Sequence, residues 1–127
     1  MRDLITGGGG FLGQKLARRL AGVGRMRDQT ITALTLCDLT APQPVDAGFA
    51  VTGHAADISD ASGVHDLFQQ HGPFDVIFHL AAVVSGAAEQ DFDLGMRVNL
   101  GGTIAVLGAA RDQENCPVVV YSSSLAV

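Results

Sequence analysis

The sequence contains few cysteines, and their spacing argues against the structures that cysteine usually builds. Cys37 and Cys116 are the only two, they lie far apart, and neither belongs to a CxxC pair. This spacing argues against a disulfide framework and against a zinc site. It favours a reduced environment, so we expect a cytoplasmic protein.

Basic residues and long hydrophobic runs are also scarce. Lys and Arg number 8 against 13 Asp and Glu, and the net charge of −5 argues against a protein that grips nucleic acid by its phosphates. A small anionic ligand stays possible, because backbone amides can hold one without basic side chains. The amino terminus is too rich in glycine for a signal peptide, and no apolar run approaches a membrane span. We therefore expect a soluble domain that binds neither nucleic acid nor membrane.

Apolar residues make up 47% of the 127 positions, enough for one domain with a substantial core. Candidate strands alternate with candidate helices along the chain. The strands are predicted over residues 4–6, 31–39, 49–55, 76–80 and 118–121. The helices are predicted over residues 11–21, 59–72 and 89–111, and a polar connector over residues 22–30.

The predicted strands are apolar throughout, which is typical of a parallel sheet covered by helices on both faces. Right-handed crossovers then predict an α/β fold with a doubly wound, five-stranded parallel sheet. In such a sheet the ligand crevice lies beyond the carboxyl ends of the strands, where the motifs described next all fall. Residues 118–121 are predicted as a buried strand that delivers the following serine hydroxyls to this edge.

The stretch TGGGGFLGQKL joins the first strand to the first helix. It satisfies both Gly7-x-x-Gly10-x-x-Gly13 and Gly8-x-Gly10-x-x-Gly13. Early glycines in such a turn permit the bend and let the backbone approach a pyrophosphate, while Gly13 lets the helix pack closely on the sheet. The helix N-terminus adds free amides and a partial positive charge. A P-loop is excluded, since Gln14 stands where that motif needs lysine, and an ordinary glycine-rich turn is the alternative.

The second predicted strand ends in an acid, Asp38. A carboxylate at this position can accept hydrogen bonds from both hydroxyls of an adenosine ribose. It would repel a 2′-phosphate by about 4 kcal/mol per charge pair at roughly 4 Å and an effective dielectric of about 20. The motif therefore favours NAD over NADP, and a solvated loop acid is the alternative.

Acids also follow the third and fourth strands. Asp57 and Ile58 could flank an adenine, while Asp60 is a candidate N-cap for the next helix; caps at both acids are the alternative. His79 lies inside an apolar strand, where we expect a hydrogen-bonded core residue rather than a general base. The acids of EQDFD, Glu89 to Asp93, lack the histidines that a transition-metal site favours, so they predict a solvated face or a helix start.

The motifs TGGGGFLG, LCDL, ADISD, FHLAA, RVNLGGT and VVVYSSSLAV occur in the order found in the extended short-chain dehydrogenase/reductase family, the NAD-dependent epimerase and dehydratase group. The chain resembles this family over its whole length. The resemblance implies a Rossmann domain that binds NAD and forms the amino-terminal, five-stranded portion of an oxidoreductase. Within the family, HLAAVVSGAAEQDFDLGMRVNL is most similar to members that oxidise a four-carbon sugar acid, so a small sugar acid is the expected substrate.

The resemblance also implies a set of site residues. The pyrophosphate is assigned to Gly7, Gly10, Phe11 and Leu12, the adenosine ribose to Asp38, and the adenine to Asp57 and Ile58. The middle of the dinucleotide is assigned to Leu80, Ala81 and Ala82, and the nicotinamide region to Ser85. Asn99 matches an asparagine that orders the centre of the site. Ser124 matches the catalytic serine that hydrogen-bonds the reacting hydroxyl, whereas Ser122 and Ser123 are expected to have backbone and packing roles.

The proton acceptor of the family is the tyrosine of a Tyr-x-x-x-Lys motif. Tyr121 is followed by SSSL, and Lys15 is the only lysine. The resemblance therefore implies that this motif and the smaller substrate domain lie downstream of Val127. We expect the chain alone to bind the dinucleotide weakly at most, without turnover, because hydride transfer needs a base and the resemblance places that base downstream of Val127.

Two other interpretations stay open. The chain could be a non-catalytic NAD-binding or interaction module, stabilised by a partner that covers residues 118–121. It could also belong to a nucleotide-sugar epimerase or dehydratase, in which bound NAD is regenerated. The resemblance implies that the helix over residues 89–111 corresponds to one that the family uses for dimer contacts, so self-association as a homodimer is a further expectation.

Overall fold

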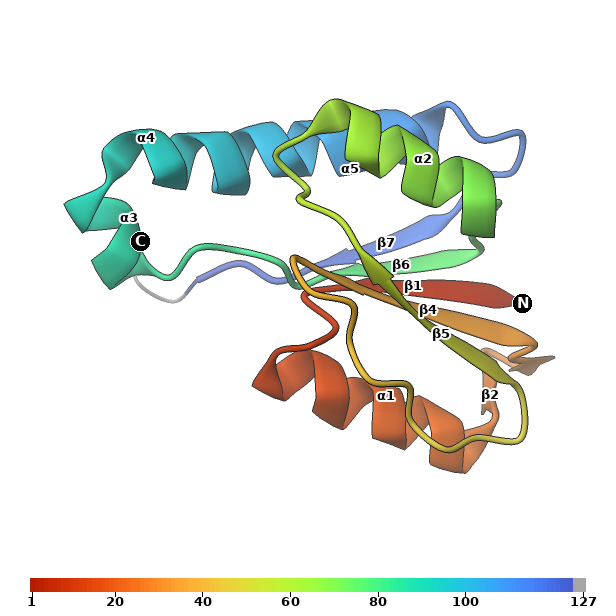
Figure 1. The fold of residues 1–127 in the computed structure, drawn as a ribbon. Helices are drawn as coiled ribbons and strands as arrows, with labels where there is room; N and C mark the ends of the chain where they lie inside the picture. Colours follow the sequence, from red (N-terminus) through yellow and green to blue (C-terminus); the bar gives the residue numbers. More distant parts are fainter. Residues whose placement is uncertain (125–127) are drawn as a thin grey trace.

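A five-stranded parallel sheet forms the centre of the protein, seen in a computed structural model that describes residues 1–124 (Figure 1). The strand order is β5-β4-β1-β6-β7. The strands are β1 (Arg2–Thr6), β4 (Ala33–Asp38), β5 (Ala50–Ala55), β6 (Val76–His79) and β7 (Val118–Tyr121). The chain builds the sheet outward from β1 through β4 to β5, then crosses to the other side of β1 and continues through β6 to β7. This confirms the predicted doubly wound α/β fold.

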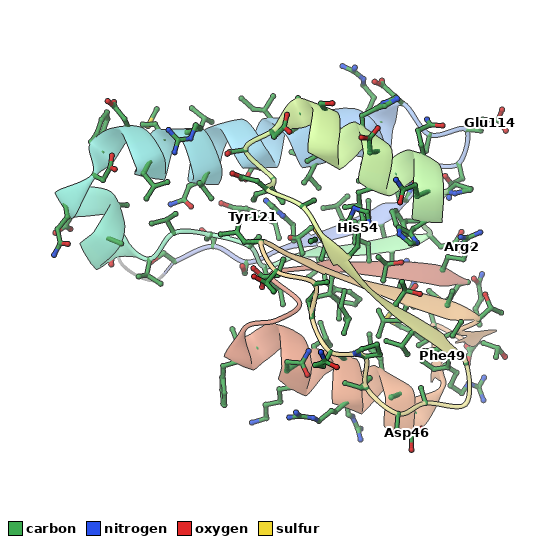
Figure 2. All side chains as sticks on the ribbon, in the orientation of Figure 1. Arg2, Asp46, Phe49, His54, Glu114 and Tyr121 are labelled. Carbon is green, nitrogen blue, oxygen red and sulfur yellow. The ribbon has the colours of Figure 1, made fainter. Side chains whose placement is uncertain are left out.

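Helices cover both faces of the sheet. Helix α1 (Phe11–Val23) lies on one face, and α2 (Ala61–His71) and α5 (Thr103–Arg111) lie on the other (Figure 1). Leu4 and Ile5 on β1 point to opposite faces because side chains alternate along a strand, and each is fully buried in a different core. Arg2 and Tyr121 mark the amino and carboxyl ends of the sheet (Figure 2).

The crossover from β6 to β7 is helical but interrupted. It consists of α3 (Ser85–Gln90), α4 (Phe92–Gly95), the π-helix η1 (Met96–Gly102) and α5. The predicted helix over residues 89–111 therefore begins four residues earlier. The break falls at Asp91, whose Oδ1 accepts from the Leu94 amide at 2.9 Å and caps α4, which confirms a helix start among these acids.

The connector after α1 forms an antiparallel hairpin of β2 (Arg25–Met26) and β3 (Gln29–Thr30), which the sequence did not predict. Its two turn residues, Arg27 and Asp28, have φ of 49° and 64°. Such turns usually carry Asn-Gly or Asp-Gly, so this pair gave no hairpin signal.

Strand β7 is where the prediction of burial was wrong. Val118, Val120 and Tyr121 are exposed, and Val119 is half-buried. Among residues 1–124, β6 is the strand that pairs with β7, so its outer edge is open to solvent. No helix in this part of the chain is long and apolar enough to cross a membrane.

Candidate functional site

The glycine turn between β1 and α1 is shaped by two steric restrictions. Gly7 has a φ of 71°, and a β-carbon there would lie 2.9 Å from the Ala81 amide nitrogen. A side chain at this position would be strained and would press on the loop after β6. A β-carbon on Gly13 would overlap the carbonyl oxygen of Gly7. At Gly13 the helix therefore packs closely on the glycine turn that follows β1, rather than on the sheet itself.

The first turn of α1 has amide groups that no side chain caps. Its N-cap is Gly10, and its first turn contains no acid. The side chains of Phe11 and Leu12 are 80% and 61% exposed, so they leave the helix end open. Lys15 Nζ lies 5.6 Å from the centroid of the Phe11 ring. The positive end of the α1 dipole and its free amides suit an anion.

A cleft of about 350 Å³ lies beyond the carboxyl ends of the central strands. Eight of the predicted site residues line it: Gly7, Gly10, Asp38, Asp57, Ile58, Leu80, Ala81 and Ala82. Six residues that were not predicted complete the lining: Cys37, Leu39, Ala56, Val83, Leu94 and Val98. Phe11, Leu12, Ser85, Asn99 and Ser124 do not belong to this lining.

The carboxylate of Asp38 faces the glycine turn. Its Oδ2 accepts from the Gly9 amide at 3.0 Å, and its Oδ1 accepts from the Leu39 amide at 2.9 Å. Each carboxylate oxygen has two lone pairs, so one acceptor site per oxygen is left after these bonds. The two amides therefore fix the carboxylate at the cleft without exhausting its capacity to accept hydroxyl donors.

Asp57 and Asp60 play different local roles. The Oδ1 of Asp57 accepts from the Ser59 hydroxyl at 2.7 Å and the Ser59 amide at 2.9 Å, and these bonds lower the pKa of Asp57. Asp60 caps α2, with its Oδ1 accepting from the Ser62 amide at 3.0 Å. The predicted cap at Asp60 is confirmed, and Asp57 remains in the cleft lining beside Ile58.

Asn99 lies in η1 and acts on the loop after β6 rather than on the cleft directly. Its Oδ1 accepts from the Val83 amide at 2.8 Å, and its Nδ2 donates to the Val83 carbonyl at 3.0 Å. Ser85 is exposed at the start of α3. Ser124 is exposed and lies three residues beyond the end of β7. The structure therefore brings neither serine into the lining of the cleft.

His79 is a core residue, as predicted. Its ring is buried between the hydroxyls of Thr6 and Thr103, and burial lowers its pKa. Ser122 donates its amide to the His79 carbonyl at 3.2 Å, which is the expected backbone role.

The cleft residues that were not predicted have only weak sequence signals for their place in the cleft. Leu94 and Val98 are four residues apart, the spacing of one helix face, and this pattern could have placed them together. Cys37 precedes Asp38 in the cleft lining. Burial raises the pKa of its thiol to about 12, so we expect this thiol to be unreactive. Within residues 1–124, no three His, Cys, Asp or Glu side chains are placed to share a metal ion.

Comparisons with known proteins agree with this architecture. The D-erythronate dehydrogenase of Cupriavidus necator is 45% identical over 133 aligned positions, which cover 100% of this chain and 40% of that protein. The D-erythronate dehydrogenase of Haemophilus influenzae is 36% identical, over 100% of this chain and 39% of that protein. The chain thus spans about 40% of the length of the curated relatives it matches.

Solved structures show the same likeness. The nucleoside-diphosphate-sugar epimerase of Agrobacterium tumefaciens superposes with a TM-score of 0.87 at 41% identity, covering 100% of this chain and 38% of that one. The NAD complex of the Y136A mutant of uronate dehydrogenase from the same organism gives a TM-score of 0.74 at 28% identity, covering 97% and 40%. Residues 4–127 match the NAD dependent epimerase/dehydratase family. With its glycine turn, the Asp38 carboxylate and the doubly wound sheet, the chain belongs to the NAD dependent epimerase/dehydratase family.

Proposed function

We propose that this chain is the NAD-binding portion of an oxidoreductase that oxidises a hydroxyl of a small sugar acid such as D-erythronate. The observation that carries the proposal is the placement of the glycine turn and Asp38 in one cleft. Gly7 and Gly10 line this cleft, so it exposes backbone without side chains that a pyrophosphate can approach closely. The identity with two D-erythronate dehydrogenases supports the sugar-acid substrate.

We assign the predicted residues to this function by position. The α1 amides at Phe11 and Leu12, with Gly7 and Gly10, hold the pyrophosphate, and Asp38 accepts from the adenosine ribose. Asp57 and Ile58 flank the adenine, and the middle of the dinucleotide lies against Leu80, Ala81 and Ala82. Ser85 serves the nicotinamide region, and Asn99 orders the centre of the site through its bonds to Val83. Eight of these residues line the cleft, whereas Phe11, Leu12, Ser85 and Asn99 lie outside its lining.

The chemistry is a hydride transfer. When bound, NAD would accept the hydride from the carbinol carbon of the substrate, and a base would accept the hydroxyl proton. Ser124 would hold that hydroxyl by a hydrogen bond, since residues 122–124 continue β7 past His79 at the same end of the sheet. Tyr121 and Lys15 lack the Tyr-x-x-x-Lys spacing, so we propose that the chain alone does not turn over.

Titration of NAD into the 127-residue chain by calorimetry tests the proposal. We expect weak, saturable binding of NAD and weaker binding of NADP, because Asp38 would repel a 2′-phosphate. No heat of binding at millimolar NAD would overturn the proposal. Formation of reduced nicotinamide on adding D-erythronate would contradict the absence of turnover.

A nucleotide-sugar epimerase is the second candidate, and the TM-score of 0.87 to the Agrobacterium tumefaciens epimerase favours it. Both candidates bind NAD in the same cleft, so titration of the cofactor alone does not separate them. The substrate domain would separate them: turnover of a UDP-sugar but not of D-erythronate by a protein that carries this domain would favour the epimerase.

We also propose that the chain forms a homodimer, within a reduced cytoplasmic compartment that suits its two unpaired cysteines. The support is an exposed apolar stripe along one continuous helical segment: Phe92, Met96, Leu100, Ile104 and Leu107. Its spacing of three and four residues places these side chains on one helix face, which can pack on a second copy of itself. Sedimentation of the chain and of Ile104→Glu tests this, and a monomer at all concentrations would refute it.

A further inference from the structure

Four polar residues form a continuous row of hydrogen bonds under the cleft. The Thr6 hydroxyl lies 2.7 Å from His79 Nδ1, and His79 Nε2 lies 3.0 Å from the Thr103 hydroxyl. The Thr103 hydroxyl in turn lies 2.7 Å from the carbonyl oxygen of Asn99. The row therefore runs from β1 through β6 to η1 and the start of α5, elements that are distant in sequence.

The direction of every bond in this row can be assigned. A carbonyl oxygen only accepts, so the Thr103 hydroxyl proton goes to Asn99 and Thr103 must accept from His79 Nε2–H. Burial lowers the pKa of His79 and keeps the ring neutral, so Nδ1 carries a lone pair and accepts from the Thr6 hydroxyl. The Thr6 oxygen then accepts from the Ala81 amide at 3.3 Å. The structure thus selects one tautomer of His79.

Both ends of the row reach the same loop. It begins at the Ala81 amide, and it ends at Asn99, whose side chain holds the amide and carbonyl of Val83. Leu80, Ala81, Ala82 and Val83 form one wall of the cleft. At the end of η1 the Thr103 amide donates to the Leu100 carbonyl, three residues earlier, while the Thr103 hydroxyl donates to the Asn99 carbonyl.

We propose that His79 is a positioning residue for the dinucleotide: through Thr6 on one side and Thr103 and Asn99 on the other, it holds the loop of residues 80–83 at the distance from the glycine turn that the cofactor requires. This role rests on the proposed function of the cleft. His79 touches neither cofactor nor substrate, and its effect reaches them only through the loop.

The first test is the tautomer itself. A long-range ¹H–¹⁵N spectrum of the labelled chain at pH 7 should show His79 protonated at Nε2 and unprotonated at Nδ1. The opposite tautomer, or a charged ring, would overturn the proposal. This measurement needs no ligand.

The second test uses a matched set of variants at Thr103. Thr103→Val keeps the shape and removes the hydroxyl, so we expect amide exchange at Val83 to accelerate about tenfold and the Kd for NAD to rise about tenfold. Thr103→Ser retains the hydroxyl and should restore both values to within about threefold of the unmodified chain. Thr35→Val is the control, because Thr35 is buried on β4 and lies outside the row and the cleft.

The outcomes separate this proposal from the proposed function. If Thr103→Val changes Val83 exchange and NAD affinity no more than Thr35→Val does, the positioning role is wrong. If the unmodified chain does not bind NAD, the proposed function fails and the dinucleotide role fails with it. The tautomer and the exchange rate of Val83 would then still decide whether the row holds the loop.

Discussion

The two ends of β1 place buried polar side chains in opposite environments. At the carboxyl end, Thr6 lies beside His79 on β6, and their side chains hydrogen-bond at 2.7 Å. At the amino end, Asp3 lies beside Val76 and is equally buried, yet neither carboxylate oxygen has a hydrogen-bond partner. The centre of the sheet therefore holds polar groups at both ends, but only the cleft end satisfies them.

The buried Asp3 carboxylate, at the unsatisfied end of β1, should lower the stability of the fold at neutral pH. Burial raises the pKa of Asp3 to about 6, the Asp75 carboxylate adds to this rise, and the terminal ammonium opposes it. A raised pKa means that the folded state binds the proton more tightly than the unfolded state. Ionising Asp3 therefore costs about 3 kcal/mol of stability above pH 6.

The largest effect is expected from breaking the satisfied end. His79→Ala removes a buried ring and leaves the Thr6 and Thr103 hydroxyls without their shared partner, so we expect a loss of about 4 kcal/mol in urea unfolding. Val76→Ala is the control on the same strand, because it removes a buried side chain and no hydrogen bond. It should lose about 2 kcal/mol, and equal losses would show that the hydrogen bonds contribute nothing.

Repairing the unsatisfied end should have the opposite sign. Asp3→Val places an apolar, β-branched side chain in a buried strand position, and we expect a gain of about 3 kcal/mol at pH 7, measured by urea unfolding. Asp46→Val removes the same charge from an exposed loop and should change stability by less than about 0.5 kcal/mol. A gain of the same size in both variants would point to net charge as the cause.

The pH dependence isolates the Asp3 carboxyl more sharply. Below its unfolded pKa of 3.8, Asp3 is protonated in both states and adds no pH dependence; the penalty grows as pH rises and is complete above about 6. Asp3→Asn does not titrate, so the stability of this variant minus that of the unmodified chain should increase by about 3 kcal/mol between pH 3 and 7. Taking the difference removes the contributions of His71 and His79, whose lowered pKa values act on both proteins alike. A flat difference would contradict a buried, ionising Asp3.

The contrast between the two ends also shows what the sequence could reveal. The doubly wound parallel sheet and eight residues of the cleft lining were predicted, because apolar runs and strand-end motifs follow from local spacing. The first strand was predicted from Leu4, since Arg2 and Asp3 are charged, whereas pairing with β4 extends it to Arg2. Asp3 is buried because its strand pairs with distant strands, and such burial of a charged residue leaves no signal in the neighbouring sequence.

The hydrogen-bonded row at the satisfied end was equally hidden. His79 was predicted as a satisfied core residue, but its partners lie 73 residues before it and 24 after it. Thr6 and Thr103 are ordinary threonines in sequence, and only the packing of η1 and α5 against β6 gives them a role. A partner covering residues 118–121 was considered, but the burial of the β7 side chains was predicted wrongly, because an apolar run does not say how many neighbours a strand has.

The smallest effect is expected at Asp38, the acid at the cleft, which contrasts with Asp3 at the unsatisfied end of the sheet. In Asp38→Asn, one backbone amide, of Gly9 or Leu39, would face an NH₂ group, and the charge that disfavours a 2′-phosphate is lost. We expect NAD affinity to fall about tenfold, or 1.4 kcal/mol, while NADP affinity stays equal or rises. Calorimetric titration of both cofactors measures this, with Asp46→Asn as the control for net charge. A parallel loss for NAD and NADP would show that Asp38 only shapes the glycine turn, whereas opposite changes require its carboxylate to meet the ribose.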